Sequence, residues 1–436
     1  MVFQRQKNMH GHILLWIKEN GGEIMKKKII AISLCLILVA AGLSGCGKTS
    51  KVSSKNPVIA DGLCKINVTG ETNLPGNFFL SFVFSRNLIM LDGKGNIVWS
   101  KHEEQPYEGA TTGFWDFKKH IIGGKTYYSY HDQTGKFDDY GLTGYAPGER
   151  VILDENFNEV KRITAEESSV TPKGQGIDGH DFYMFDLDHY ICSVYIKDNV
   201  KNIPGYPEGS NVIYSYLQEV QNGKVVWDFK SIDYPEIYDI VATDATPNAN
   251  DFANKTIDAP DINHFNAMRV DNDGNLICSF RHLDTIMCLD RTRGDNQIRW
   301  KMSGKQDEFG LTELQKTSGQ HYVTVDDNKI TVFDNNNRDK QTEVRSYVLD
   351  IPNRKVDLVK SIGFNNKFSQ ACGSIQMLEN NMYVIGWGWA TTDNECMSVY
   401  NNNKDDRNEK KGENDKVMSV TLDNPKDITY RAVYYD

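Results

Sequence analysis

The 436-residue sequence predicts an all-β fold. After residue 60, helix signals are scarce and short runs rich in β-branched and aromatic residues recur. Turns containing Gly, Asn and Asp separate these runs, as expected between strands. With 39% hydrophobic and 11% aromatic residues, the chain can bury one large core or two smaller ones.

The β-rich runs recur as hairpins. Three clear copies join two strands through a Gly-containing turn and carry a tryptophan near their end: residues 88–100, 212–229 and 285–302. Weaker copies occupy residues 151–163, 344–362 and 417–435. Most of these outer hairpins follow an inner one, at residues 114–132, 179–195, 263–282, 319–335 and 372–389. Before the first outer hairpin, only the run FFLSFVF at 78–84 is visible.

An inner and an outer hairpin together make a four-stranded antiparallel unit. Six such units in radial order make a six-bladed β-propeller, which we predict for residues 61–436. A β-sandwich is the structural alternative. In a propeller, the first strand of each blade lines the central channel, and its start lies at the same mouth as the end of the second strand.

One hairpin brings a histidine and an arginine to that mouth. If the turn of residues 263–282 is centred between Asn272 and Asp273, His264 faces Arg281 at the open end of the hairpin. Two cationic or semi-cationic groups held together at a strand end indicate an anion site. Two surface residues flanking an ordinary hairpin are the alternative.

The neighbouring inner strands begin with further histidines. By the same symmetry, His180 and His321 lie at the same mouth. The turn positions pair His180 with Tyr195 and His321 with Asp334, within one residue of register. Four long connections fall on this side and are expected to surround the mouth: residues 131–149, 196–211, 232–262 and 390–416.

The N-terminal segment reads as an export signal. Lysines at 26–28 precede an apolar run at 29–43 and the sequence Leu-Ser-Gly-Cys ending at Cys46, which resembles a bacterial lipoprotein signal. We expect residues 1–24 to be a mis-annotated start before Met25, residues 25–45 to be the signal peptide, and residues 46–60 to be a polar tether with Cys46 lipidated. The predicted location is extracytoplasmic, with a lipid anchor in the cell membrane. The phosphate-loop pattern at 42–49 lacks the strand and helix that it needs, and the lipoprotein signal accounts for it.

Charge and cysteine usage exclude other classes. A net charge of −10 and a pI near 5.6 argue against a nucleic-acid partner. The six cysteines after Cys46 show no metal-ligand spacing, and DNDGN at 271–275 reads as a hairpin turn, so we expect neither a metal nor a cofactor. Cys278 and Cys288 flank a turn and can face each other as a disulfide, or remain buried free thiols.

Three segments carry a family resemblance. IDGHDFYMFDLDHYI, the segment from DAPDINHFNAMRV to KMSGKQDEFG, and the segment from SGQHYVTVDDNKITVFDN to RSYVLD resemble successive motifs of the bacterial arylsulfotransferase family. The resemblance covers most of residues 75–436. It implies a six-bladed propeller that moves a sulfuryl group from an aryl sulfate to a phenolic acceptor without a nucleotide donor. Well-described members also carry an N-terminal β-sandwich and a disulfide near the site, for which this sequence shows no room and no clear counterpart.

The resemblance also implies roles for the mouth residues. His321 becomes transiently sulfated, His264 and Arg281 hold the sulfuryl oxygens, and His180 lies near the bridging oxygen. The chemistry fits these residue types, because an imidazole attacks sulfur, fixed donors stabilise the oxygens, and one histidine can serve as acid and then base. Further candidates for substrate contact are Asn263, Tyr195, Asp334, Trp387 and Trp389, with Asp334 fixing the tautomer of His321. We expect no catalytic duty for His131, His189 and His282.

Two other functions remain open at this stage. A propeller can keep its fold and bind a ligand or partner at the cell surface without turnover. An aryl sulfatase would use the same donor but would transfer the group to water.

Overall fold

A computed structural model describes residues 57–135, 144–243, 246–364, 366–379, 382–401, 409–411 and 415–436, which lie in one compact unit. In these ranges, strands predominate and the helices are single turns: η1 (Ser231–Asp233), α2 (Glu236–Asp239) and η2 (Arg281–Leu283). No helix within them is long and apolar enough to cross a membrane. The predictions for Met25 and Cys46 concern residues outside the described ranges.

Two sheets contain an inner and an outer hairpin in sequence order, as predicted. The first holds β9 (Tyr183–Asp186), β10 (His189–Val200), β11 (Ser210–Gln221) and β12 (Lys224–Lys230). The second holds β13 (Phe265–Val270), β14 (Leu276–Phe280), β15 (Thr285–Leu289) and β16 (Ile298–Ser303). Neighbouring strands in both sheets run antiparallel.

Two larger sheets extend this pattern. One contains β17 (His321–Asp326), β18 (Lys329–Asp334), β19 (Glu343–Asp350) and β20 (Lys355–Phe364), with β24 (Glu409–Lys411) added in parallel to β20. The other has eight strands: β2 (Asn77–Phe82), β3 (Asn87–Asp92), β4 (Ile97–His102), β5 (Phe114–Ile122), β6 (Lys125–Gln133), β7 (Gly148–Leu153), β8 (Glu159–Ile163) and, paired to β2, β26 (Thr429–Tyr435) off the main path. A single residue pair, Phe82 with Phe114, joins its two halves.

The predicted outer hairpin at 417–435 is wrong. Its first strand, β25 (Lys416–Leu422), pairs with β23 (Glu395–Asn401) and β1 (Ile66–Gly70), in a sheet completed by β21 (Ser374–Met377) and β22 (Met382–Gly386). Its second strand, β26, pairs with β2 instead. The C-terminal strand therefore supplies the inner position that residues 78–84 lacked, and part of the predicted loop 390–416 is the strand β23.

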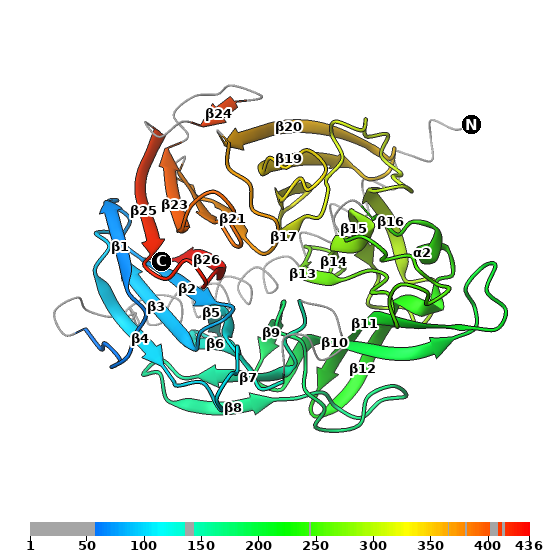
Figure 1. Cartoon of the computed structure of the whole chain (residues 1–436), viewed down its shortest axis with the longest axis horizontal. Coiled ribbons are helices and arrows are strands. Elements are labelled where there is room, and N and C mark those ends of the chain that lie inside the picture. The colour runs from blue at the N-terminus through cyan, green and yellow to red at the C-terminus, as the bar shows by residue number, and fades with distance from the viewer. Residues whose placement is uncertain are drawn as a thin grey trace, which may run out of the picture. The chain divides into compact units, whose positions relative to one another are not determined.

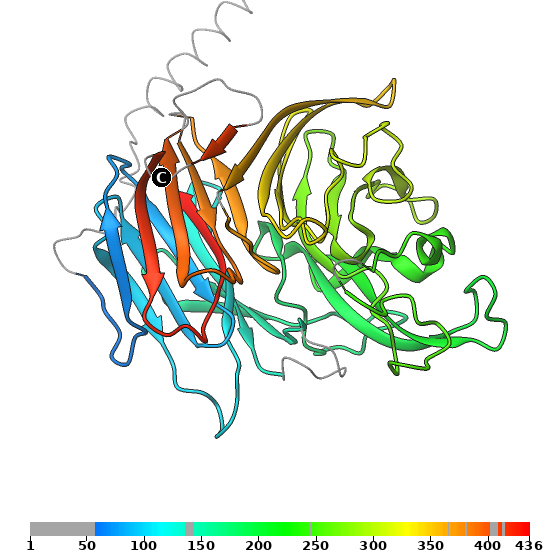
Figure 2. The same ribbon diagram turned by 45° about the horizontal axis from the view of Figure 1, so that its top comes forward.

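The sheets are arranged radially as a β-propeller (Figure 1). The turned view shows the same sheets packed face to face around the ring (Figure 2). The described residues form five hydrogen-bonded sheets. Dividing the eight-stranded sheet at Phe82 and Phe114 gives six groups, four with four strands and two with five, and the blade number six stays a prediction. Apolar clusters fill the space between neighbouring sheets, so burial of adjacent faces holds the ring together.

The six cysteines of the described residues are free thiols. Cys278 pairs in register with Met287, whereas Cys288 pairs with Ile277. Their side chains therefore point to opposite faces of the sheet, and each packs in a different apolar cluster. The predicted disulfide alternative is wrong, and buried free thiols are observed.

Candidate active site

A cavity of about 560 Å³ lies where the inner strands begin. His180, His264, Arg281 and His321 all line it, so the predicted convergence of these four residues is observed. Each side chain is nearly buried, with residue exposures between 2% and 8%. Such a site holds its donors in fixed positions and excludes most bulk water.

His264 and Arg281 are joined as the sequence predicted. The backbone N–H of Arg281 donates to the carbonyl of His264 at 2.9 Å, next to the pair Phe265 and Phe280. The turn lies half a residue from the predicted centre, since Val270 pairs with Leu276. A bulge between Phe265 and Ala267 shifts the register back, and the two deviations cancel.

Asp261 organises His264 through two contacts. Its Oδ1 accepts from the backbone N–H of His264 at 3.0 Å, and its Oδ2 lies 2.6 Å from Nδ1 of the ring. These bonds hold His264 in the left-handed backbone region, at φ 47°. Gly144 approaches the other side of the ring, where a Cβ would lie 3.1 Å from Cε1 of His264.

His282, predicted to have no duty, also lines the cavity. Its ring stacks on that of His264 with centroids 4.6 Å apart. Its Nδ1 lies 2.9 Å from the carbonyl oxygen of Asp261 and its Nε2 lies 2.7 Å from Oγ1 of Thr246. The sequence signal was the run Arg-His-Leu-Asp directly after β14, which forms the turn η2.

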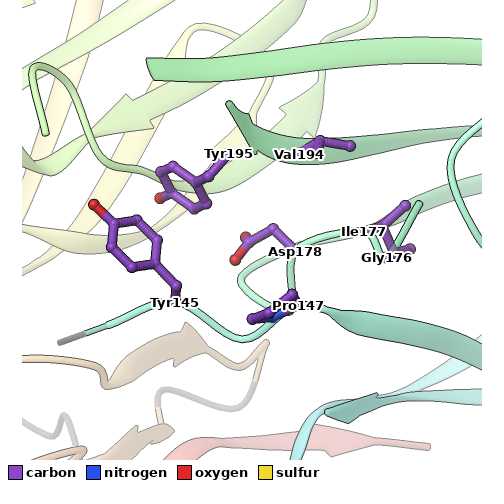
Figure 3. A pocket seen from close by; sticks show the side chains of 7 residues that line it. All are labelled: Tyr145, Pro147, Gly176, Ile177, Asp178, Val194 and Tyr195. Carbon is purple, nitrogen blue, oxygen red and sulfur yellow. The ribbon is translucent and has the colours of Figure 1, made fainter. Parts of the chain in front are cut away.

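His180 has a carboxylate partner of the same kind. Both oxygens of Asp178 lie within 3.0 Å of Nδ1, and Oδ2 accepts from the backbone N–H of His180. The predicted neighbour Tyr195 is close, with ring centroids 5.9 Å apart, but its hydroxyl donates to the carbonyl of Phe265. Asp178, Tyr195 and Tyr145 border a small cavity of about 10 Å³ beside the main one (Figure 3).

His321 is held by an amide, not by the predicted carboxylate. Its Nδ1 lies 2.8 Å from Oδ1 of Asn335. The amide nitrogen of Asn335 donates to the carbonyls of Ser369 and Cys372 at 2.8 and 3.1 Å, which fixes the amide orientation. Since Oδ1 can only accept, Nδ1 of His321 carries the proton and Nε2 carries the lone pair.

Asp334 does not face His321. A bulge between His321 and Val323 shifts the ladder by one residue, so His321 pairs with Phe333. Asp334 is fully buried and accepts from Nε of Arg345 at 2.7 Å. It therefore supports a strand and does not line the cavity.

Arg281 is positioned by two neighbouring loops. One Nη donates to Oγ1 of Thr246 at 2.7 Å and the other donates to the carbonyl of Gln370 at 3.3 Å. Thr246 belongs to the predicted loop 232–262, and Gln370 precedes β21. The guanidinium lines the cavity with several N–H groups in a planar fork suited to sulfuryl oxygens.

Burial and neighbouring charges keep three of the histidines neutral. Burial, followed by the charges of His180 and Arg281, holds the pKa of His264 well below its usual value. Burial, followed by Arg281, holds the pKa of His321 well below its usual value. Burial likewise lowers the pKa of His282 to about 3. Without substrate, these rings are therefore neutral at neutral pH.

Of the remaining residues predicted to contact substrate, Trp389 lines the cavity, whereas Trp387 and Asn263 do not. Trp389 lines the cavity, where its indole is available to an aromatic ring. Trp387 is fully buried, donates to Oγ of Ser398 at 2.6 Å and packs on Phe364 in the core. Asn263 is fully buried and its Oδ1 accepts from Ser215, so it fixes a strand end and does not line the cavity.

Three of the four predicted loops contribute to the cavity wall. Gly144 and Tyr145, Thr246 with Pro247 and Asp261, and Thr391 come from the predicted loops 131–149, 232–262 and 390–416. Residues 196–211 contribute none of the described lining. The residues that position the histidines were not predicted from the sequence. These residues are Asp178, Asp261 and Asn335, and each stands within three residues of a motif residue or of its predicted partner.

One cluster has the composition of a metal site. Ligand atoms of Asp261, His264 and His282 lie within 4.8 Å of one another. The hydrogen-bond partners given above already occupy both ring nitrogens of His282 and Nδ1 of His264. The cluster is thus explained as a hydrogen-bonded support of the two rings.

Comparison with known proteins identifies one family. The sequence model described as Arylsulfotransferase (ASST) matches residues 135–391. A search of curated proteins returns no match.

Solved structures resemble the chain only distantly. A Bacteroides caccae protein of unknown function has 9% identity and a TM-score of 0.44, covering 83% of this chain and 99% of that one. A Lactobacillus plantarum protein has 8% identity and a TM-score of 0.40, with 83% and 100% covered. A streptogramin B lyase has 10% identity and a TM-score of 0.34, with 82% and 98% covered. At these scores, no functional argument rests on them.

Proposed function

The chain belongs to the arylsulfotransferase family, and we propose that it transfers a sulfuryl group from an aryl sulfate to a phenol through a covalent intermediate on His321. The family match indicates aryl sulfotransferase activity in general, with an aryl sulfate donor and a phenol acceptor. The observation that carries the finer proposal is the fixed tautomer of His321. Its Nδ1 donates to Asn335, which leaves the Nε2 lone pair for attack in a cavity shared with Arg281.

In the first half-reaction, the Nε2 lone pair of His321 attacks sulfur and the bond from sulfur to the aryl oxygen breaks. The electron pair of that bond stays on the phenolate oxygen, which takes a proton from protonated His180. Asp178 supports this role, because its carboxylate lies within 3.0 Å of Nδ1 and orients the ring.

In the second half-reaction, an acceptor phenol occupies the place of the departed phenol. Its proton passes to His180 and its oxygen attacks sulfur. The bond from sulfur to Nε2 breaks and returns its electron pair to His321. Both enzyme groups thereby regain their starting protonation states, and no further reactant is needed.

The developing charge on the sulfuryl oxygens requires donors. Arg281 supplies fixed N–H groups in the cavity. Neutral His264 has its proton on Nδ1, toward Asp261, so Nε2 becomes a donor only when the ring gains a second proton. We infer that the negative charge of the bound ester supports this proton on His264.

The proposal is tested with p-nitrophenyl sulfate in the absence and presence of phenol. A stoichiometric burst of p-nitrophenol without phenol, and a protein heavier by one sulfuryl group at His321, are expected. Mapping of the group to another residue overturns the mechanism. Release that continues without phenol indicates a sulfatase, and no release under either condition indicates a binding protein.

We also propose that the mature protein is held outside the cytoplasmic membrane through lipidated Cys46. The charged n-region, the apolar run and the Leu-Ser-Gly-Cys sequence support this. Incorporation of a labelled fatty acid that is lost in Cys46→Ala is the expected result. A mature N-terminus other than Cys46 would contradict it.

A further inference from the structure

A second cavity, of about 370 Å³, lies at the other end of the inner strands. Each of six inner segments lines the first cavity near its start and the second further along the chain. The pairs are Trp115 and Lys119, His180 and Tyr183, His264 and Arg269, His321 and Thr324, Cys372 and Gln376, and Ile428 and Tyr435. The second cavity is therefore the opposite mouth of the channel.

A buried charged network separates the two cavities. We call it the channel cluster; it consists of Asp116, Lys118, Arg150, Asp181, Arg269 and Arg431. Five members are at most 9% exposed, and Arg269 is partly exposed at the second cavity. Two of its cations, Lys118 and Arg269, line that cavity directly.

The two carboxylates of the cluster are shared. Asp116 accepts from Arg150 at 3.0 Å and from Arg431 at 2.6 Å. Asp181 contacts Lys118, and its Oδ2 lies 3.1 Å from Arg269. In the described part of the chain, no other carboxylate forms an ion pair with these four cations.

The cluster thus holds four cationic groups against two carboxylates. Burying uncompensated charge is costly, and a protein relieves it by losing a proton or by binding a counter-ion. Two of these cations lower the pKa of a neighbouring histidine. Burial, followed by the charges of Arg150 and Lys118, lowers the pKa of His120 in the wall of the second cavity to about 3.

The wall of the second cavity is also aromatic. Phe182, Tyr183, Tyr322 and Tyr435 line it together with Lys119. The ring of Tyr322 lies between two guanidinium groups, 4.5 Å from that of Arg269 and 4.7 Å from that of Arg431. Flat rings beside an excess of positive charge match a ligand with an aromatic body and one anionic group.

We propose that the second cavity is a binding site for a small aromatic anion, distinct from the catalytic cavity at the other end of the channel. Lys118 and Arg269 neutralise its acidic group, and Tyr183 and Tyr435 of the cavity wall contact its aromatic body. A cavity of this volume accommodates one or two fused rings. The site requires no catalytic step, so the inference does not depend on the proposed reaction.

The test uses 1-naphthoate, which has no sulfuryl group to transfer, and the full chain in detergent. Calorimetric titration is expected to show one site that Arg269→Gln weakens by about 10- to 100-fold, the scale of one charged hydrogen bond. Arg281→Gln, at the catalytic cavity, should leave that site intact. Because Arg269→Gln reduces the charge excess, we also expect it to raise the melting temperature without ligand.

A second variant protects the test against a folding defect in Arg269→Gln. Lys119→Glu reverses a charge on the cavity wall and should weaken the same site, whereas Lys125→Glu, exposed at the start of β6, should not. Binding that only Arg281→Gln removes would overturn the proposal. An equal effect of inorganic sulfate at the same concentration would overturn the aromatic ligand class.

Discussion

Three of the four histidines that line the cavity, His180, His264 and His321, receive different support at Nδ1. His180 and His264 each face a carboxylate, from Asp178 and Asp261. His321 faces the amide oxygen of Asn335. A carboxylate stabilises a ring that carries positive charge, whereas an amide orients the ring without favouring the charge. This difference supports the proposed roles, in which His180 and His264 carry protons and His321 is the uncharged nucleophile.

Removing His321 should produce the largest effect. In His321→Asn, no lone pair attacks sulfur, and we expect turnover to fall by a factor on the order of 10⁶, as when a covalent nucleophile is lost. The burst and the covalent adduct should both disappear, which rapid-quench kinetics and intact-protein mass measure. His189→Asn, whose ring pairs with Glu219 away from the cavity, is the matched control. An adduct that persists in His321→Asn would exclude His321 as the carrier.

Arg281 affects both the carboxylate-supported His264 and the amide-supported His321, since its charge helps to lower the pKa of each ring. Arg281→Ala should reduce the rate of adduct formation by about 10²- to 10³-fold, the typical cost of one fixed donor to developing charge. Single-turnover release of p-nitrophenol measures this rate. The variant should still form the adduct, and Arg299→Ala, at an exposed position of β16, should behave as wild type. A fully active Arg281→Ala would remove this residue from the mechanism.

The sequence predicted the cavity residues better than it predicted their supports. His264 and Arg281 were found because a hairpin fixes which residues face each other, and here a bulge corrected the turn position. At His321 a similar bulge moved the pairing away from the predicted register. As a result, the side chain of Asn335, and not that of Asp334, contacts the ring. Bulges depend on tertiary packing around the channel, so local sequence patterns do not reveal them.

The strand pairing that closes the propeller ring was also not predictable from local sequence patterns. Residues 417–435 look like one hairpin, because two β-rich runs flank a turn containing Asn424 and Pro425. The second run instead pairs with β2, more than 300 residues earlier. Only the unfilled inner position beside residues 78–84 indicated that a strand had to come from elsewhere.

Exchanging the amide for a carboxylate tests the comparison directly. Asn335→Asp should place a negative charge at Nδ1 of His321 and raise its pKa from its present low value. The protonated ring has no lone pair on Nε2, so activity near neutral pH should fall. We expect a loss of about 10- to 100-fold, as when a residue that orients a functional histidine is changed. Since deprotonation restores the nucleophile, activity should recover as pH rises.

The pH profile separates this role from a structural one. Arg281, His180 and His264 also face His321, and they remain unchanged in Asn335→Asp. Asn335→Ala provides the control, because it loses the orienting bond without adding charge and should lower activity at all pH values alike. Identical pH profiles for the two variants would show that Asn335 acts only through packing.

The reverse exchange, Asp261→Asn, should have a smaller effect. An amide at this position no longer stabilises the proton that His264 gains with substrate, so KM for the aryl sulfate should rise by about tenfold, corresponding to about 1.4 kcal/mol. The maximal burst amplitude should be kept, because His321 is untouched. Steady-state kinetics and burst amplitude in the same preparation separate these two quantities. A lost burst with an unchanged KM would contradict the role given to His264.

The smallest expected effect concerns protons taken up on binding. In the free protein, burial and neighbouring charges hold the pKa of His264 well below its usual value, so the ring is neutral at neutral pH. The bound ester is an anion and raises that pKa, so binding draws one proton onto His264. Between the lower pKa of the free protein and the higher pKa of the complex, affinity must therefore fall as pH rises, by at most tenfold per pH unit.

Calorimetry of a non-reacting aryl sulfonate in buffers with different ionisation enthalpies should give up to one proton taken up per ligand. His264→Gln keeps a hydrogen-bonding side chain that does not titrate, and in this variant the uptake should vanish. Equal uptake in both proteins would place the proton on another group, with His180 the next candidate because its Nδ1 lies 2.9 Å from Oδ2 of Asp178.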